Sequence, residues 1–107
     1  MASSVQRLVS TVLGTSAVTL YTSPTGTWTQ ITKLLLVNTS GSTQTATLAI
    51  VAAATSYTTT NAQGLLPSQS WNSPNEYGLV LNPGDGLSAF ASAGSAITFI
   101  LAGLLLQ

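Results

Sequence analysis

Apolar and polar residues alternate along much of the chain with the period of two that is typical of β-strands. The clearest case is the segment from Gln44 to Val51, whose two faces are Ala46, Leu48 and Ile50 on one side and Thr45, Thr47 and Ala49 on the other. This pattern predicts a strand that packs its apolar face on a core and turns a threonine-rich face to water. Residues 17–22 alternate in the same way.

An apolar segment, Thr27–Val37, precedes this strand, and the polar residues 38–43 join the two. The joining residues are Asn, Thr, Ser and Gly, which favour turns because glycine permits positive φ and Asn and Ser bond to the nearby backbone. We therefore expect residues 27–51 to form a hairpin at the centre of the fold. The turn is longer than a tight hairpin turn, so its register stays open.

The segment from Val5 to Leu13 fits two structures. Its apolar residues follow a helical spacing, with Ser4 as an N-cap and Gly14 as a stop. Several of them are β-branched, however, which favours a strand. We expect a strand here, with a short helix as the alternative.

The middle of the chain alternates less clearly. The polar run Tyr57–Gly64 predicts a surface loop that contains a short edge strand. We further expect a short strand within 68–72, another at 76–81, a turn at 82–86 and a strand at 86–92.

The last strand, Ala96–Leu106, is apolar on both faces, with Ile97, Phe99, Leu101 and Leu105 on one side and Ile100, Ala102, Leu104 and Leu106 on the other. Such a strand is central in a covered sheet or is covered by a partner. Because only the inner face of a sandwich strand should be dry, we expect the outer face to be an interface. The candidate interface residues are Ile100, Leu104 and Leu106, together with the aromatic residues Tyr57 and Trp71.

Short strands with turns about every 8–12 residues predict an all-β fold, a single antiparallel β-sandwich that is jelly-roll-like or immunoglobulin-like, with about seven or eight strands. A chain of 107 residues is too short for two domains. We expect residues 1–16 to form an N-terminal arm or first strand and residues 17–107 to form the sandwich core.

Charge is almost absent from this chain. Charged residues make up 4% of it, against about 25% in an average soluble domain. They are Arg7, Lys33, Glu76 and Asp85, and they sum to zero. A surface without charge favours association, although a neutral threonine-rich surface that merely stays soluble is the alternative. Without a basic patch we expect no nucleic-acid partner, and without about 20 consecutive apolar residues we expect no membrane helix.

Residues for chemistry are equally scarce. The chain has no His and no Cys, which excludes the usual nucleophile activation and zinc sites. Asp85 lies in the turn at 82–86, where we expect it to accept hydrogen bonds from nearby N–H groups rather than bind calcium. We therefore expect no enzyme, and no catalytic, cofactor-binding or metal-binding residue. Exposed Trp or Tyr side chains leave a sugar-binding platform as an alternative role.

Three motifs resemble those of small virion structural proteins of tailed bacteriophages. They are Leu20-Tyr21-Thr22-Ser23-Pro24-Thr25-Gly26, then Ile31-Thr32-Lys33-Leu34-Leu35-Leu36-Val37-Asn38-Thr39-Ser40-Gly41, and Leu81-Asn82-Pro83-Gly84-Asp85-Gly86-Leu87-Ser88-Ala89. The resemblance covers residues 17–106 and departs from the family pattern around 57–75. It implies a β-sandwich that oligomerises in the particle, and it brings no catalytic residues.

On these grounds we expect a capsid decoration (cement) protein that stabilises the head shell through neutral, apolar contacts. Its expected partners are further copies of itself, as a homotrimer, and the major capsid protein, in a virion assembled in the bacterial host cytoplasm. One alternative is a tail, neck or fibre-associated virion protein. A second is a carbohydrate-binding module, which predicts exposed aromatic side chains around a groove and a stable monomer.

Overall fold

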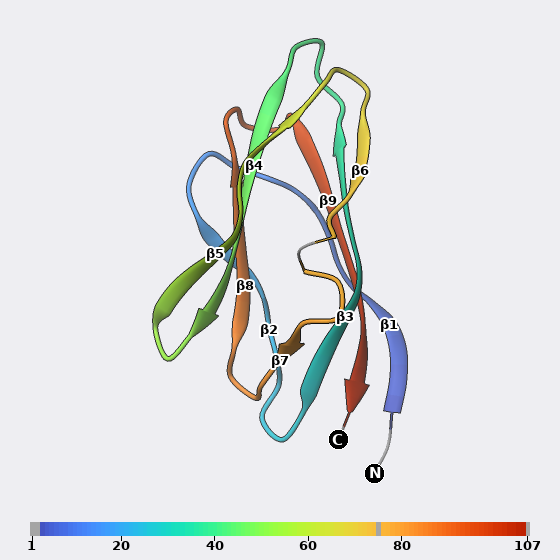
Figure 1. Cartoon of the computed structure of the whole chain (residues 1–107), viewed down its shortest axis with the longest axis vertical. Coiled ribbons are helices and arrows are strands. Elements are labelled where there is room, and N and C mark those ends of the chain that lie inside the picture. The colour runs from blue at the N-terminus through green and yellow to red at the C-terminus, as the bar shows by residue number, and fades with distance from the viewer. Residues whose placement is uncertain (1–2, 75, 107) are drawn as a thin grey trace.

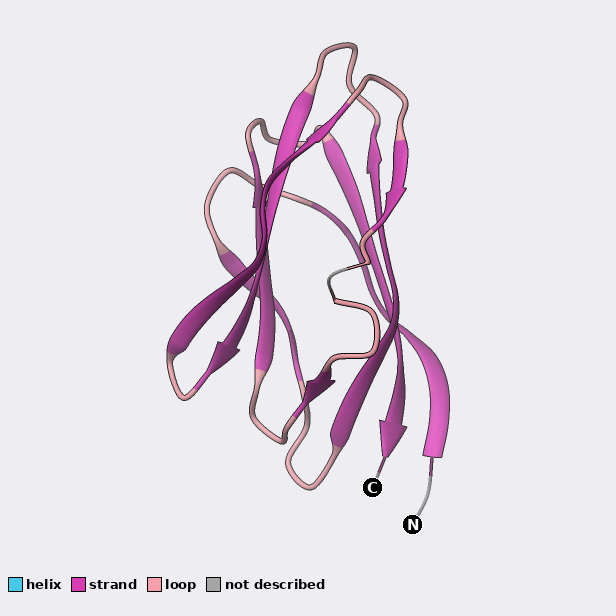
Figure 2. Ribbon diagram, viewed as in Figure 1, coloured by secondary structure: helices cyan, strands magenta, loops and turns pink. Residues whose placement is uncertain are grey.

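The computed structural model describes residues 3–74 and 76–106, which form nine strands and no helix. The strands are β1 (Ser3–Val12), β2 (Val18–Thr22), β3 (Trp28–Asn38), β4 (Gln44–Ala52), β5 (Thr55–Leu65), β6 (Ser70–Asn72), β7 (Val80–Leu81), β8 (Gly86–Ala91) and β9 (Ile97–Leu106). Two antiparallel sheets face each other (Figures 1 and 2). The expected β-sandwich is confirmed. No helix of the described chain is long and apolar enough to cross a membrane.

The strands divide unequally between the sheets. Sheet A has the order β1-β9-β3-β6, with β7 also paired to β3, and sheet B has the order β2-β8-β4-β5. Both ends of the chain therefore lie in or beside sheet A, at the same end of the molecule (Figure 1). The long central strands of sheet A are β9 and β3.

The core fills the space between the sheets with side chains from alternate strand positions. In sheet A, Leu36 lies directly opposite Phe99 and Leu34 opposite Leu101, and all four are buried. In sheet B the alternation expected for β4 holds as far as Leu48, because Ala46 and Leu48 are buried while Thr45 and Thr47 are only half-buried. Beyond Leu48, where the register to β5 shifts, Ala49 is buried and Ile50 is only half-buried, against the expectation. Burying each large apolar side chain stabilises the fold by about 1.5–3 kcal/mol before entropy is counted.

The expected central hairpin is wrong. Its two arms exist as β3 and β4, but β3 pairs only within sheet A and β4 only within sheet B. Residues 39–43 therefore form an arch that carries the chain from one sheet to the other. Both strands bury one apolar face, and an arch lets the two faces meet across the core instead of lying side by side.

The side chain of Asn38 fixes this arch. Asn38 is fully buried, and its Nδ2 donates to the carbonyl oxygens of Ser42 and Leu65, each at 2.9 Å. Its Oδ1 accepts from the backbone N–H of Ser40 at 2.9 Å and from the Ser40 hydroxyl at 2.7 Å. Because buried amides need partners, this network makes the arch conformation the one that satisfies Asn38.

The segment at 5–13 is a strand, and the helical alternative is wrong. β1 pairs with β9, and its register shifts between Arg7 and Val9, which leaves Leu8 as an extra residue. Because of this bulge, Leu8 and Val9 both pack against the core although they are adjacent in the sequence. The bulge breaks the period of two and gives the apolar residues their helix-like spacing.

Two expectations for the middle of the chain also fail. The run expected to be mostly loop is β5, an 11-residue strand paired along β4 at the edge of sheet B. Its polarity reflects its position at the edge, where most of its side chains are exposed. The strand expected at 76–81 shrinks to Val80–Leu81, because residues 76–78 turn and Gly78 adopts a φ of 84°.

The role of Asn38 can be tested with the variant Asn38→Ala. We expect it to lower the free energy of unfolding by about 2–4 kcal/mol, because the variant loses four hydrogen bonds and takes a donor from the carbonyl of the buried Leu65. Urea denaturation measures the change. The matched control is Asn61→Ala on the exposed part of β5, where we expect a change within about 0.5 kcal/mol. Equal effects of the two substitutions would contradict the role of the arch.

Candidate functional site

The first candidate site is the face of sheet A that points away from sheet B. It consists of Ile100, Ala102, Leu104 and Leu106 of β9, flanked by Trp28, Gln30, Lys33 and Leu35 of β3 and by Arg7 and Ser10 of β1, and we call it the outer face of sheet A. Along β9 buried and half-buried residues alternate up to Leu104, as the sequence predicted. β9 lies between β1 and β3, so neighbouring side chains cover part of this apolar stripe.

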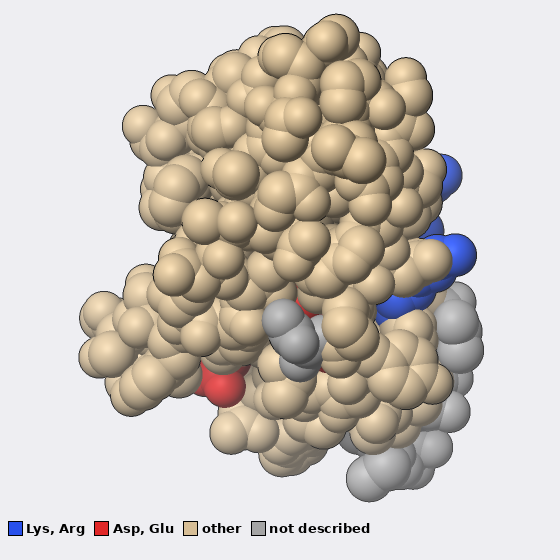
Figure 3. Space-filling view, turned by 45° about the horizontal axis from the view of Figure 1, so that its top comes forward, with Lys and Arg blue, Asp and Glu red and all other residues tan. Residues whose placement is uncertain are grey.

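Both cations of the chain lie on this face. Ala102 pairs with Arg7 on one side and with Lys33 on the other, so the two cations flank the apolar stripe. Figure 3 shows the Lys and Arg atoms gathered on one side of the molecule, away from the exposed acidic atoms. No carboxylate of the described residues lies on this face, because Glu76 is buried and Asp85 lies in the 82–86 turn.

The structure does not bring the five candidate interface residues together. Ile100, Leu104 and Leu106 share the outer face of sheet A. Tyr57 lies on β5 in sheet B, opposite Ile50, and is 58% exposed. Trp71 lies on β6 opposite the buried Leu36 and packs against the core from the inner side of sheet A.

A second feature, not predicted from the sequence, is a buried carboxylate. Glu76 is 0% exposed and accepts hydrogen bonds from the hydroxyls of Ser73, Thr59 and Thr60, the last at 2.8 Å. Thr59 and Thr60 belong to β5 of sheet B, whereas Ser73 directly follows β6 of sheet A. The carboxylate thus ties the edges of the two sheets together.

No cation is needed to hold Glu76. Burying a carboxylate is costly unless its oxygens are hydrogen-bonded, and here the hydroxyls supply those bonds. The sequence offers one local signal, the spacing of Ser73 and Glu76, which places a hydroxyl and a carboxylate three residues apart around a turn. The two threonines come from β5, a long way back in the sequence, so only the fold reveals them.

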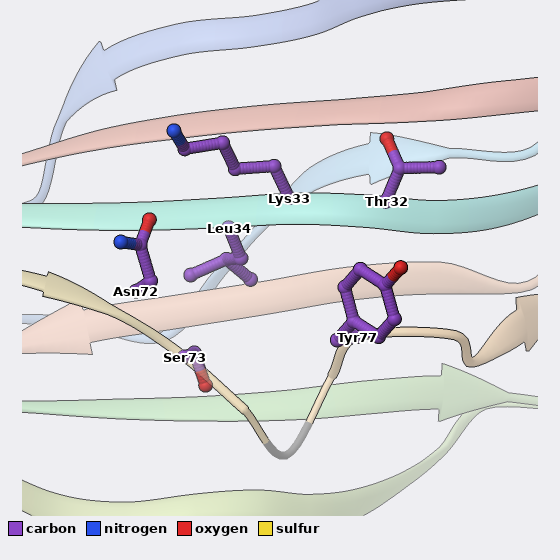
Figure 4. A pocket seen from close by; sticks show the side chains of 6 residues that line it. All are labelled: Thr32, Lys33, Leu34, Asn72, Ser73 and Tyr77. Atoms are coloured by element: carbon purple, nitrogen blue, oxygen red, sulfur yellow. The ribbon is translucent and has the colours of Figure 1, made fainter.

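A third feature is a hollow of about 290 Å³ between β3 and the chain that connects β6 to β7 (Figure 4). Its lining residues are Thr32, Lys33, Leu34, Asn72, Ser73 and Tyr77. Tyr77 is 70% exposed. We call this feature the β3 hollow.

Asp85 is placed as expected. Its Oδ2 accepts a hydrogen bond from the backbone N–H of Asn82 at 3.1 Å, inside the 82–86 turn, which confirms it as a turn aspartate. Among residues 3–74 and 76–106, no three His, Cys, Asp or Glu side chains come together as metal ligands would.

The chain matches no family model, no curated protein and no solved structure. A proposal on function therefore rests on the motifs and on the surfaces described above.

The hydroxyl cage of Glu76 can be tested by two substitutions. Glu76→Ala removes the acceptor of three buried or half-buried hydroxyls, and we expect it to lower the free energy of unfolding by about 2–4 kcal/mol. Glu76→Gln keeps a carbonyl acceptor and nearly the same shape, so its loss should be clearly smaller. Urea denaturation of both variants at neutral pH makes the comparison. A Glu76→Ala protein as stable as the wild type would show that the cage is not needed for the fold.

Proposed function

We propose that this chain is a bacteriophage virion structural protein, a capsid decoration (cement) protein that binds the head shell through the outer face of sheet A. The observation that carries the proposal is the apolar stripe on the outer side of β9, a central strand of sheet A between β1 and β3. In a monomeric sandwich that side should be polar, because it faces water.

The composition of the face suits a permanent contact. Interface cores are depleted of charged residues and enriched in large apolar and aromatic side chains. Leu104, Leu106 and the 43%-exposed Trp28 supply such side chains. Removing apolar area from water contributes about 25 cal/mol per Å², and this contribution is not weakened by the screening that salt exerts on charges. The flanking Arg7 and Lys33 favour a shell surface that presents carboxylates.

Self-association as a homotrimer belongs to the same proposal. Natural sandwiches protect their open edges with charges, prolines, bulges or short strands. β5 is an edge strand of 11 residues that contains neither charge nor proline, and its protection is limited to two bulges in its pairing with β4. Such an edge supports contact with other copies of the chain, in keeping with the motifs that resemble oligomeric virion proteins.

A position in the tail, neck or fibre would use the same surfaces. The alternatives differ in their partner, so binding to the head shell separates them. The carbohydrate-binding alternative is favoured by a different observation, the exposed Tyr77 at the β3 hollow, and it concerns a different part of the surface.

The interface can be tested with Leu104→Glu. We expect the variant to lose both self-association and binding to undecorated capsids, because a carboxylate would be buried in an apolar contact. The isolated fold should persist, since Leu104 is only half-buried and Arg7 and Lys33 lie within reach of the new carboxylate on the same face. Light scattering at two concentrations, followed by co-sedimentation with capsids, measures the change.

The matched control is Thr19→Glu, which places the same side chain at an exposed position on β2 of sheet B. It should assemble like the wild type. If Leu104→Glu assembles normally, the outer face of sheet A is not the interface. If it unfolds by circular dichroism, Leu104 is a core residue and the interface lies elsewhere.

A further inference from the structure

The β3 hollow exists because the edge of β3 is left without a partner over a few residues. β7 pairs with Thr29 and Gln30, and β6 pairs with Leu35 to Val37. Between them three backbone hydrogen bonds join the chain to β3. The Gly78 N–H donates to the Ile31 carbonyl at 2.7 Å, the Ile31 N–H donates to the Leu79 carbonyl at 2.9 Å, and the Ser73 N–H donates to the Leu34 carbonyl at 2.9 Å. Thr32 and Lys33 lie between these contacts, where β3 also carries a bulge.

Four polar side chains line the hollow without being used by the fold. They belong to Thr32, Lys33, Asn72 and Tyr77. None of them forms a hydrogen bond or an ion pair with another residue of the described chain. The hydroxyl of Ser73 differs, because it donates to Glu76 in the interior and so offers the hollow no donor. A concave surface with several uncommitted polar groups is typical of a ligand site.

The polar groups are sorted along the hollow. In Figure 4 the ammonium of Lys33 and the amide of Asn72 lie at one end, and the hydroxyls of Thr32 and Tyr77 lie at the other. The side chain of Leu34 is buried in the core, so the ring of Tyr77 is the apolar surface of the hollow. The site therefore has a cationic end and a hydroxyl end.

This arrangement selects one ligand chemistry. An ammonium and an amide at the same end of the hollow, on either side of β3, favour a carboxylate that reaches both through charge-assisted hydrogen bonds. Hydroxyls at the other end both donate to and accept from the hydroxyls of a ligand, while the Tyr77 ring offers apolar contact to carbon atoms. Ligand pockets usually measure about 300–1,000 Å³, so this hollow suits one ring and not a chain of rings.

We propose that the β3 hollow binds a single sugar residue that carries a carboxylate, of the uronic-acid type. The carboxylate lies at the Lys33 and Asn72 end, and ring hydroxyls face Thr32 and Tyr77. A free acidic sugar and the terminal residue of a polysaccharide present the same group. This activity goes beyond the virion role, and it does not depend on the interface at Leu104.

The test is a titration of the full chain with glucuronic acid. The chemical shifts of the amide groups in nitrogen–proton NMR spectra report the binding. We expect saturable shifts at millimolar ligand, concentrated around Thr32, Asn72 and Tyr77. Glucose has the ring without the carboxylate and should bind about tenfold more weakly, the factor that one lost charge-assisted bond implies. Acetate has the carboxylate without the ring and should give no saturable shift.

Variants separate the two ends of the site. Lys33→Gln should remove the preference for glucuronic acid over glucose, and Tyr77→Ala should weaken both ligands. The control Tyr57→Ala removes another exposed tyrosine, on β5, and should change the binding of neither sugar. The proposal is overturned if glucuronic acid gives no saturable shift, if the shifts lie away from the hollow, or if Lys33→Gln binds both sugars as the wild type does.

An oligosaccharide that ends in glucuronate then shows whether the ligand is a free acidic sugar or the terminal residue of a glycan. Binding as tight as that of the monosaccharide assigns the terminal residue of a glycan, whereas exclusion of the oligosaccharide assigns a free acidic sugar. All measurements use the unassembled protein. A lack of sugar binding therefore does not bear on the assembly test with Leu104→Glu. A lack of assembly likewise does not bear on the sugar-binding test.

Discussion

The carboxamide of Asn38 is the interaction on which the two-sheet architecture depends. It holds the chain at the point where β3 leaves sheet A and the arch begins, and it also bonds to the end of β5 through Leu65. An isolated turn of this composition is compatible with a hairpin, in which β3 and β4 would share one sheet. Pairing β4 with β8 and β5 instead lets Leu34 and Leu36 meet Leu48 across a core. The side chain that stabilises this arrangement is uncharged, as is almost every other side chain of the protein.

The sequence allowed the fold class and several strands to be predicted because side-chain periodicity is local. The alternation in β4, as far as Leu48, and the two apolar faces of β9 are visible residue by residue, and both are confirmed. The arch was mistaken for a hairpin because the choice is decided by contacts of Asn38 with Leu65, 27 positions away. The strand β1 looked partly helical because a bulge at Leu8 depends on its neighbour β9. Each of these two errors arises from a contact with a residue far away in the sequence, which the local pattern of apolar and polar residues does not reveal.

The surfaces divide in the same way. The outer face of sheet A was predicted because it follows from the periodicity of one strand. The hydrogen bonds around Glu76 and the β3 hollow were not predicted, because both form where the chain between β6 and β7 leaves the edge of β3. The turn in this segment replaces part of an expected strand. It buries the side chain of Glu76 and leaves the side chain of Tyr77 exposed to solvent. Two adjacent residues thus differ in burial because the chain turns at this point. The turn contains Gly78, and glycine adopts its positive φ without steric strain.

Lys33 lies where the two proposed surfaces meet. Its backbone pairs with Ala102 beside the apolar stripe, and its side chain lines the β3 hollow. One ammonium cannot donate fully to a shell carboxylate and to a sugar carboxylate in the same place, because each contact requires desolvation and a fixed geometry. If both proposals hold, shell binding and sugar binding should therefore compete for Lys33. Arg7, on the other side of Ala102, is free of this conflict, and so the shell contact should depend on Arg7 more than on Lys33.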